Sequence, residues 1–271
     1  TIKHTFEQIF RREGFNPVTI EGDAFHRFNR ADMKAELEKR VAAGDSTFSH
    51  FSYDANELEE LERVFRTYGE TGTGHTRHYV HDEEEARRFG VPPGEFTDWA
   101  PFESDSDLLF YEGLHGSVKN DAIDLTRYAD LKIGVVPVIN LEWIQKIHRD
   151  KASRGYSTEA VTDTILRRMH AYVHCICPQF AETDINFQRA PVVDTSNPFI
   201  ARWIPTPDES IVVIRFKNPR GIDFPYLISM IEGSWMSRAN SIVIPGNKQD
   251  LAMQLIFTPL IERLVEKARR A

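Results

Sequence analysis

The sequence predicts an α/β protein, and three observations lead to this prediction. Short apolar runs at residues 18–20, 108–111 and 131–139 do not alternate with polar residues, which is typical of strands buried on both faces. Stretches with apolar residues at helical spacing separate these runs. Acidic side chains follow two of the runs, at Asp23 and Glu112. Ligands of α/β proteins bind beyond the carboxyl ends of parallel strands, so this pattern favours an enzyme.

The first half of the chain alternates the two kinds of element. Ile2, Phe6 and Ile9 form one apolar face of a helix, and glycine can end such a helix in the left-handed conformation. We expect helices over residues 2–14, 32–43, 55–68 and 81–90, and strands over residues 18–20, 76–80 and 108–111.

The second half continues with a strand over residues 131–139 and a helix over residues 141–153. Ser157 caps a further helix that ends at Pro178. Residues 179–209 are rich in proline and have few periodic runs, so we expect mostly loop. Strands over residues 211–216 and 241–244 and a helix over residues 249–268, interrupted or kinked at Pro259, complete the prediction.

Length and composition indicate one globular domain over residues 1–271. The chain is 41% hydrophobic and 27% charged, with no repeat or evident linker. Its formal charge of −8 disfavours a nucleic-acid partner or an anionic membrane surface. The longest apolar run, residues 133–144, contains proline and polar residues and is too short to span a membrane.

The two cysteines bear on the cellular compartment. Cys175 and Cys177 are too close in sequence for an ordinary structural disulfide, and there is no other cysteine. This usage favours a reduced, cytoplasmic setting.

The stretch after the first strand carries the most chemistry. Asp23, His26 and Arg30 follow Gly22 within eight residues, and Lys34 lies one helical turn beyond Arg30. The cations form a candidate anion site opposite Asp23, and guanidinium groups match phosphate geometry, so a phosphorylated small molecule is favoured. The alternative is that Asp23 only caps the turn before Phe25.

A second group of charges lies farther along the chain. Glu112 directly follows a buried strand, as a Mg²⁺-associated carboxylate does in a nucleotide-binding protein, although strand-end acids are common. Lys146, Arg149 and Arg154 cluster around Asp150, and such basic groups stabilise a transferred phosphoryl group. The alternative is a solvated helix face with favourable cations at its end.

Two histidine patterns suggest a metal site without establishing one. His75, His78 and His81 recur every third residue, which alternates faces on a strand. His170 and His174 lie one helical turn apart beside Cys175, but the glutamate of a metallopeptidase motif is absent. A structural or surface role is the better interpretation.

Several long blocks resemble one enzyme family. The chain is similar to the phosphoribulokinases, and to their proteobacterial class in particular, along essentially its whole length. The blocks that carry the resemblance are VTIEGDAFHR (18–27), FYEGLHG (110–116), NLEWIQKIHRD (140–150), RRMHAYVH (167–174), DTSNPFIAR (194–202) and GSWMSRAN (233–240).

The resemblance implies a P-loop kinase fold related to the nucleoside monophosphate kinases, with a mixed central sheet flanked by helices. Members phosphorylate the C1 hydroxyl of D-ribulose 5-phosphate with MgATP in the Calvin cycle. The family begins with a strand and a glycine-rich phosphate loop, whose last hydroxyl residue Thr1 resembles. We therefore expect that the first strand and the phosphate loop are absent from this chain.

The resemblance also implies roles for individual residues. Asp23 corresponds to the base that orients and deprotonates the C1 hydroxyl. The sugar phosphate is implied to contact His26, Arg30, Lys34, Tyr79, His81 and Arg154. Lys146, Arg149 and Asp150 correspond to a closing lid and the phosphoryl-transfer site, and Glu112, Asp150 or both to the Mg²⁺ ligands. Arg215 and Arg238 are candidate effector or interface positions.

Regulation and assembly follow from the same resemblance. In the proteobacterial class NADH activates, AMP inhibits, and the enzyme is a large homo-oligomer such as an octamer. Two other functions stay open: a uridine-kinase-like nucleoside kinase, against which the basic set of Arg30, Lys34 and Arg154 argues, and a non-catalytic nucleotide-sensing scaffold.

Overall fold

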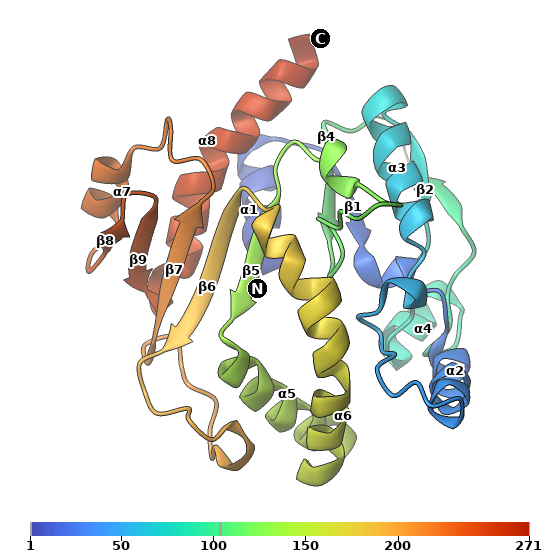
Figure 1. Ribbon diagram of the computed structural model, residues 1–271. Helices are drawn as coiled ribbons and strands as arrows, with labels where there is room; N and C mark the ends of the chain where they lie inside the picture. The colour runs from blue at the N-terminus through green and yellow to red at the C-terminus, as the bar shows by residue number, and fades with distance from the viewer. Residues whose placement is uncertain (1, 103–104, 271) are drawn as a thin grey trace. The chain divides into compact units, whose positions relative to one another are not determined.

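The computed structural model describes residues 2–102 and 105–270, without the side chains of residues 153 and 154, and it forms two compact units (Figure 1). Unit 1 consists of residues 1–9, 131–166 and 183–264, and unit 2 of residues 10–130, 167–182 and 265–271. Thr1, which resembles the end of a phosphate loop, lies outside the described residues. The single domain over residues 1–271 stays a prediction.

The elements alternate along the chain as an α/β protein requires, which confirms the predicted class. The helices are α1 (Ile2–Glu13), α2 (Arg30–Ala42), α3 (Leu58–Thr71), α4 (Glu83–Phe89), α5 (Ile139–Arg154), α6 (Thr158–Ala171), α7 (Phe224–Met230) and α8 (Gln249–Arg270). The strands are β1 (Pro17–Glu21), β2 (Gly74–Thr76), β3 (Ala100–Phe102), β4 (Leu108–Glu112), β5 (Ile133–Pro137), β6 (Ile185–Pro191), β7 (Ser210–Phe216), β8 (Trp235–Arg238) and β9 (Ser241–Pro245).

Unit 1 is built on a five-stranded mixed sheet in the order β5-β6-β7-β9-β8 (green to dark red in Figure 1). The pair β5 and β6 is parallel, and the other pairs are antiparallel. Aromatic contacts pack helices onto this sheet: the ring of Phe257 in α8 lies 5.6 Å from Phe187 in β6 and 5.2 Å from Phe6 in α1. All three rings are buried.

Unit 2 contains two small sheets, the parallel pair β1 and β4 and the antiparallel pair β2 and β3. The apolar stripe of α3, with Leu61 and Val64 fully buried, packs against Ile20 of β1 and Phe25 of the following turn. Complete burial of such side chains stabilises the unit by roughly 2 kcal/mol each before entropy is counted. This core holds the turn that carries Asp23.

One local prediction is wrong, and one strand was missed. Residues 179–209 are mostly loop, as expected, but they also contain β6, which lies between β5 and β7 in the five-stranded sheet. Ile185 and Phe187 face the core in alternation with polar residues, a pattern that the neighbouring prolines obscured. The strand expected over residues 76–80 ends at Thr76, and Tyr79 forms only an isolated bridge with Phe96.

Other boundaries differ less. α3 begins at Leu58, three residues later than predicted, and α8 continues through Pro259. Strands β3 and β8 and helix α7 were not predicted, since each is short and has no marked periodicity. None of the helices in the described part of the chain is both long and apolar enough to cross a membrane.

Candidate active site

The carboxyl ends of β1 and β4 lie together at one edge of unit 2. Glu21 pairs with Glu112 in the parallel register, and Gly22 and Gly113 follow directly. A Cβ atom on Gly22 would lie 2.7 Å from the Cα atom of Gly113. The backbone after β1 and the backbone after β4 therefore approach this closely only because both residues are glycine. Asp23 and Glu112 therefore emerge at the same edge, as the sequence pattern predicts.

Asp23 lies in the short 3₁₀ turn over Gly22–Phe25 and does not cap a helix. The cap of α2 is Asn29, whose Oδ1 accepts from the backbone N–H of Asp32 at 2.7 Å. The alternative function of Asp23 as a cap is therefore wrong. Its carboxylate instead contacts two imidazole rings: Oδ1 lies 3.1 Å from Nε2 of His26, and Oδ2 lies 3.4 Å from Nε2 of His81.

The electrostatics of this site favour an ionised Asp23. The hydrogen bond from His26 holds the pKa of Asp23 below its ordinary value, against the opposing effect of burial. The charges of His26, His81 and His50 act in the same direction as the hydrogen bond. A carboxylate that stays ionised has the state that a general base needs.

The structure brings three more predicted residues to Asp23 and His26. Nη2 of Arg30 donates to the backbone oxygen of His81 at 3.0 Å. The ring of Tyr79 stands edge-on to His81, at 5.0 Å between centroids, and to His26, at 6.3 Å. Asp23, His26, Tyr79 and His81 are thus neighbours, and Arg30 is linked to them through the backbone of His81. Lys34 is exposed one turn farther along α2.

Sequence reasoning missed two residues that support the turn after β1. The guanidinium of Arg77 donates from Nε to the backbone oxygen of Ala24 at 2.8 Å and from Nη2 to that of His26 at 2.7 Å. It also lies over the rings of Phe96, at 3.7 Å, and Trp99, at 4.6 Å. Asn56, the second residue, contacts the ring of His26. A lone arginine or asparagine carries no sequence signal for such contacts.

The other predicted catalytic group lies on α5, in unit 1. Lys146 and Asp150 stand one helical turn apart with 2.5 Å between Nζ and Oδ2, and Nε of Arg149 lies 3.3 Å from Oδ1. Asp150 is 3% exposed, whereas the Arg149 side chain is 64% exposed, so the alternative of a solvated face fits Arg149 but not Asp150. Burial raises the pKa of Asp150, but Lys146 and Arg149 outweigh it and hold the pKa below its ordinary value. The side chain of Arg154 lies outside the described residues.

Metal binding rests on few groups. Glu112 is an exposed carboxylate at the end of β4, and carboxylate oxygen is the ligand that Mg²⁺ takes. Within the described ranges, no three His, Cys, Asp or Glu side chains are grouped to hold an ion. The rings of His170 and His174 stack at 4.2 Å, and Nδ1 of His174 contacts the backbone oxygen of His170, which fits the structural interpretation.

The histidines at every third position also have separate surroundings. His75 contacts Glu60 at 2.5 Å, His78 stacks on Phe89 at 4.5 Å, and His81 faces Asp23. They therefore do not converge on one ion.

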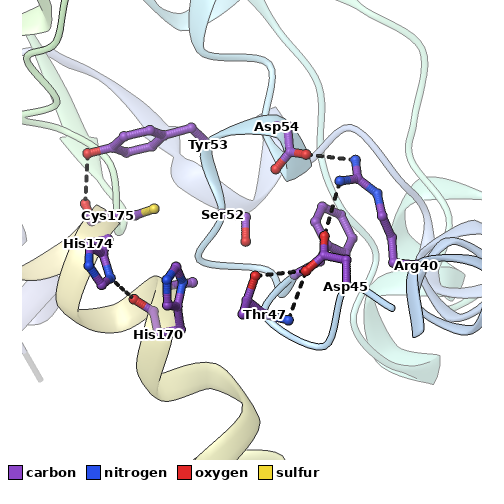
Figure 2. A pocket seen from close by; sticks show the side chains of 11 residues that line it. Arg40, Asp45, Thr47, Ser52, Tyr53, Asp54, His170, His174 and Cys175 are labelled. Carbon is purple, nitrogen blue, oxygen red and sulfur yellow. Dashed lines mark hydrogen bonds and ion pairs between the residues drawn. The ribbon is translucent and has the colours of Figure 1, made fainter. Parts of the chain in front are cut away.

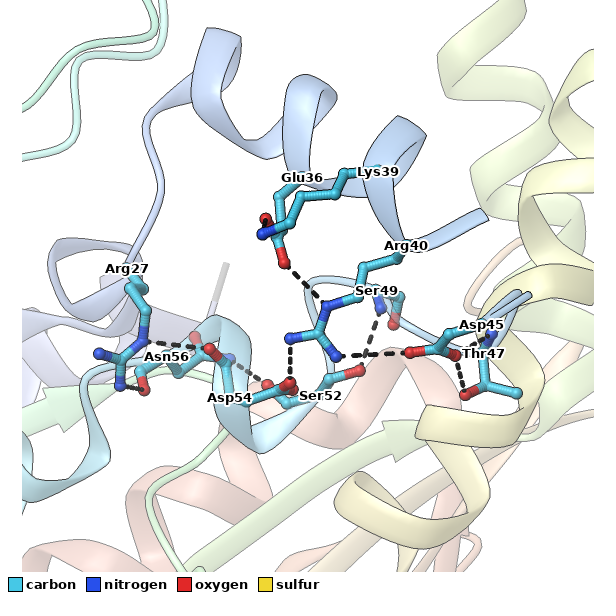
Figure 3. Close-up of polar contacts among 10 residues, drawn as sticks. All are labelled: Arg27, Glu36, Lys39, Arg40, Asp45, Thr47, Ser49, Ser52, Asp54 and Asn56. Atoms are coloured by element: carbon cyan, nitrogen blue, oxygen red, sulfur yellow. Dashed lines mark hydrogen bonds and ion pairs between the residues drawn. The ribbon is translucent and has the colours of Figure 1, made fainter. Parts of the chain in front are cut away.

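A pocket of about 360 Å³ lies in unit 2 between residues 40–54 and residues 170–175 (Figure 2). None of the predicted site residues lines it. At its rim, the guanidinium of Arg40 contacts the carboxylates of Glu36, Asp45 and Asp54 (Figure 3). These contacts fasten α2 to the loop that leads to Asn56.

Arg215 and Arg238 lie in the sheet of unit 1, on the two strands that flank β9. Both are exposed, and both are in register with Ser241 of that strand. The sheet thus brings two cations that are distant in sequence to the same position of β9.

Comparisons with known proteins agree on one family. Residues 1–196 match the Phosphoribulokinase / Uridine kinase family. The chain is 81% identical to phosphoribulokinase 2 of Cereibacter sphaeroides and 70% identical to a phosphoribulokinase of Nitrobacter vulgaris, over all of this chain and 93% of each relative. The solved structure of a phosphoribulokinase from Rhodobacter spheroides superposes with a TM-score of 0.93 at 76% identity, covering 99% of this chain and 94% of that one.

Proposed function

The chain belongs to the phosphoribulokinase family, and we propose that it transfers the γ-phosphoryl group of ATP to the C1 hydroxyl of D-ribulose 5-phosphate, which yields ribulose 1,5-bisphosphate and ADP for the Calvin cycle. The observation that carries this proposal is the carboxylate of Asp23 between the rings of His26 and His81, with Arg30 alongside. A base surrounded by cationic groups suits a substrate that is both an alcohol and a phosphate.

Asp23 is the general base. A sugar hydroxyl is a weak nucleophile at neutral pH, so it gains most from a fixed carboxylate that accepts its proton as the oxygen attacks phosphorus. The C1 oxygen forms the new bond to the γ-phosphorus, the bond from phosphorus to the β-phosphate oxygen breaks, and ADP leaves. The low pKa of Asp23 keeps it ionised for this step.

Cationic and aromatic groups bind the sugar phosphate. We assign this function to His26, Arg30, Lys34, Tyr79 and His81 in unit 2, and from the resemblance also to Arg154 in unit 1. Arg30 is exposed, and its Nη2 donates to the backbone oxygen of His81, which links the guanidinium to a residue that contacts the base. The same groups disfavour a neutral nucleoside, because burying them against uridine would leave their charges unpaired.

Lys146, Arg149 and Asp150 are assigned to the closing lid and the phosphoryl-transfer step. Their cations balance the charge that spreads over the transferred group. Glu112, Asp150 or both would hold Mg²⁺, which when bound neutralises the phosphates of ATP. A glycine-rich phosphate loop before residue 1, and an absent first strand, stay predictions from the resemblance.

Regulation and assembly extend the proposal. Arg215 and Arg238 flank Ser241 and form a cationic site for an anionic effector. The expected effectors are NADH as activator and AMP as inhibitor. A homo-oligomer, such as an octamer, is supported by the edge strand β8, where Trp235 is 48% exposed. We place the protein in the bacterial cytoplasm.

A coupled assay for ADP tests the function. The intact protein, its mass checked by mass spectrometry, is supplied with MgATP and either ribulose 5-phosphate or uridine. We expect turnover with the sugar phosphate and at most about 1% of that kcat/KM with uridine, because a phosphate contact contributes roughly 3 kcal/mol. A preference for uridine would support a nucleoside kinase, and nucleotide binding without turnover would support the scaffold. Either result would overturn the proposal.

A further inference from the structure

The ring of His26 is held at both of its nitrogen atoms. Nδ1 lies 2.8 Å from Oδ1 of Asn56, and Nε2 lies 3.1 Å from Oδ1 of Asp23. The His26 side chain is 15% exposed and Asn56 is 2% exposed, so water does not readily replace the contact between these two side chains. The position of the proton on this ring therefore depends on what Asn56 presents.

Asn56 presents an oxygen. Its Nδ2 donates to the backbone oxygen of His50 at 3.0 Å and to that of Ser52 at 2.8 Å, the second contact being visible in Figure 3. Backbone oxygens can only accept, so the amide nitrogen must be the atom that faces them. Oδ1 then faces His26, and an amide oxygen can only accept as well.

Nδ1 of His26 must accordingly carry a proton. A neutral imidazole has one N–H group, and this one is already used by Asn56. Nε2 would then direct a lone pair at the carboxylate of Asp23, which is repulsive. We propose that Asn56 is a positioning residue that fixes a proton on Nδ1 of His26, so that His26 holds an ionised Asp23 only as a doubly protonated imidazolium.

The loop that carries Asn56 is held firmly enough to impose this choice. The backbone N–H of Glu57 donates to Phe25 at 2.7 Å, and that of Arg27 donates to Ala55 at 2.9 Å, which pairs the loop with the turn of Asp23. Nη2 of Arg27 also donates to the backbone oxygen of Asn56 at 3.1 Å (Figure 3). Rotation of the Asn56 amide would break two hydrogen bonds to buried carbonyls.

Other titratable groups face His26 as well. Asp23 lies on the same turn, and His50 faces the ring from the loop, at 5.6 Å between ring centroids. From the segment after β2 come Tyr79, at 6.3 Å between ring centroids, and His81, which also contacts Asp23. From the turn after β4 comes His115, whose pKa the charge of His26 lowers. The guanidinium of Arg77 contacts the backbone oxygen of His26. Among these, Asn56 and Asp23 are the groups that contact the ring nitrogens.

The consequence for catalysis rests on the proposed function. While His26 is an imidazolium, it fixes one oxygen of the base and adds positive charge where the sugar phosphate binds. When the ring loses a proton, the remaining proton stays on Nδ1 and the hold on Asp23 is lost. We therefore expect kcat/KM for the sugar phosphate to fall on the alkaline side as His26 deprotonates.

The ring itself is tested by nuclear magnetic resonance, without reference to activity. The intact protein is labelled with ¹⁵N-histidine, and His26 is assigned by loss of its signals in His26→Gln. As the pH is raised until the ring loses its second proton, we expect its signals to change from those of the imidazolium to those of the neutral Nδ1–H tautomer. A neutral Nε2–H tautomer in the wild-type protein would overturn the proposal, and this measurement needs no Asn56 variant to fold.

The variant Asn56→Ala gives the second test. Without the acceptor at Nδ1, the neutral ring can keep its proton on Nε2 and donate it to Asp23. We expect the neutral form to become Nε2–H and the alkaline fall in kcat/KM to be reduced at least about threefold, a change of roughly 0.7 kcal/mol. Unchanged ring signals in a folded Asn56→Ala protein would contradict the proposal.

Gln179 supplies a matched control. It is a buried amide of the same unit, whose Nε2 donates to Leu114 and Cys175 and whose Oε1 accepts from Ser117. Gln179→Ala should lower stability but leave the His26 signals and the pH profile unchanged. If both variants changed the His26 signals and the pH profile equally, the change would reflect a general loss of stability, and the proposal would be overturned. An absence of turnover with ribulose 5-phosphate would refute the proposed function alone, because the tautomer is read from the ring.

Discussion

The ring of His115 donates from Nε2 to the backbone oxygen of Phe51 across 3.0 Å, which joins the turn after β4 to the loop that carries Asn56. His115 is 3% exposed, and burial lowers its pKa from 6.5 to about 4. The hydrogen bond to Phe51 opposes this change only in part. The ring is therefore neutral at physiological pH, and the link between the two loops depends on a group that acid would charge.

Acid should destabilise unit 2 through His115. Because the pKa is lower in the folded state, the stabilisation is complete above the unfolded value of 6.5 and is lost as pH falls toward 4. We expect a loss of about 2 kcal/mol in the free energy of unfolding between neutral pH and pH about 5. His115→Gln keeps a donor and should remove most of this loss. Urea unfolding at the two pH values measures it, with the exposed His174→Gln as control; equal losses in wild type and His115→Gln would contradict the assignment.

Replacing the base should abolish most turnover without unfolding the protein. Asp23→Asn keeps the shape and the contacts to His26 but cannot accept the hydroxyl proton. We expect kcat to fall at least about 10²-fold, as general-base catalysis contributes. Steady-state kinetics and circular dichroism check this, with the exposed Asp98→Asn as control. Near-normal turnover in Asp23→Asn would exclude Asp23 as the base.

Removing Arg30 should affect one substrate selectively. A charge-assisted contact to phosphate contributes roughly 1.5–3 kcal/mol, so Arg30→Ala should raise the KM for ribulose 5-phosphate at least about tenfold. The KM for ATP should change less than about twofold. Arg87→Ala, an exposed arginine of α4, is the control. A defect confined to ATP would count against the site as described.

Substitutions of Lys146 and Asp150 on α5 should affect stability and activity in different ways. Lys146→Met removes the ammonium group that lies 2.5 Å from the buried carboxylate of Asp150, so the free energy of unfolding should fall by roughly 2 kcal/mol. Adding Asp150→Asn removes the buried negative charge that Lys146 balances and should restore part of this stability, but not kcat. Urea unfolding and kinetics on both variants, with Lys151→Met as control, decide this. Recovery of activity in the double variant would refute a direct role in transfer.

Local signals in the sequence were enough for much of the fold. The strands β1, β4 and β5 follow from apolar runs without alternation, and α1 follows from one apolar face that ends before Gly14 at a φ of +70°. Strand β6 was missed because its partners are distant: Ile185 pairs with Ile133 and with Phe216. Such pairing depends on chain segments that no local pattern relates.

The candidate site likewise has features that the sequence predicts and features that only the tertiary structure shows. Asp23, His26 and Arg30 lie within eight residues after a buried strand, so their grouping is a property of the sequence. That His81 reaches the second oxygen of Asp23, and that Asn56 sets the proton on His26, depend on contacts across 30 residues or more. Hydrogen-bond direction and burial determine protonation, and both arise only when distant segments pack together.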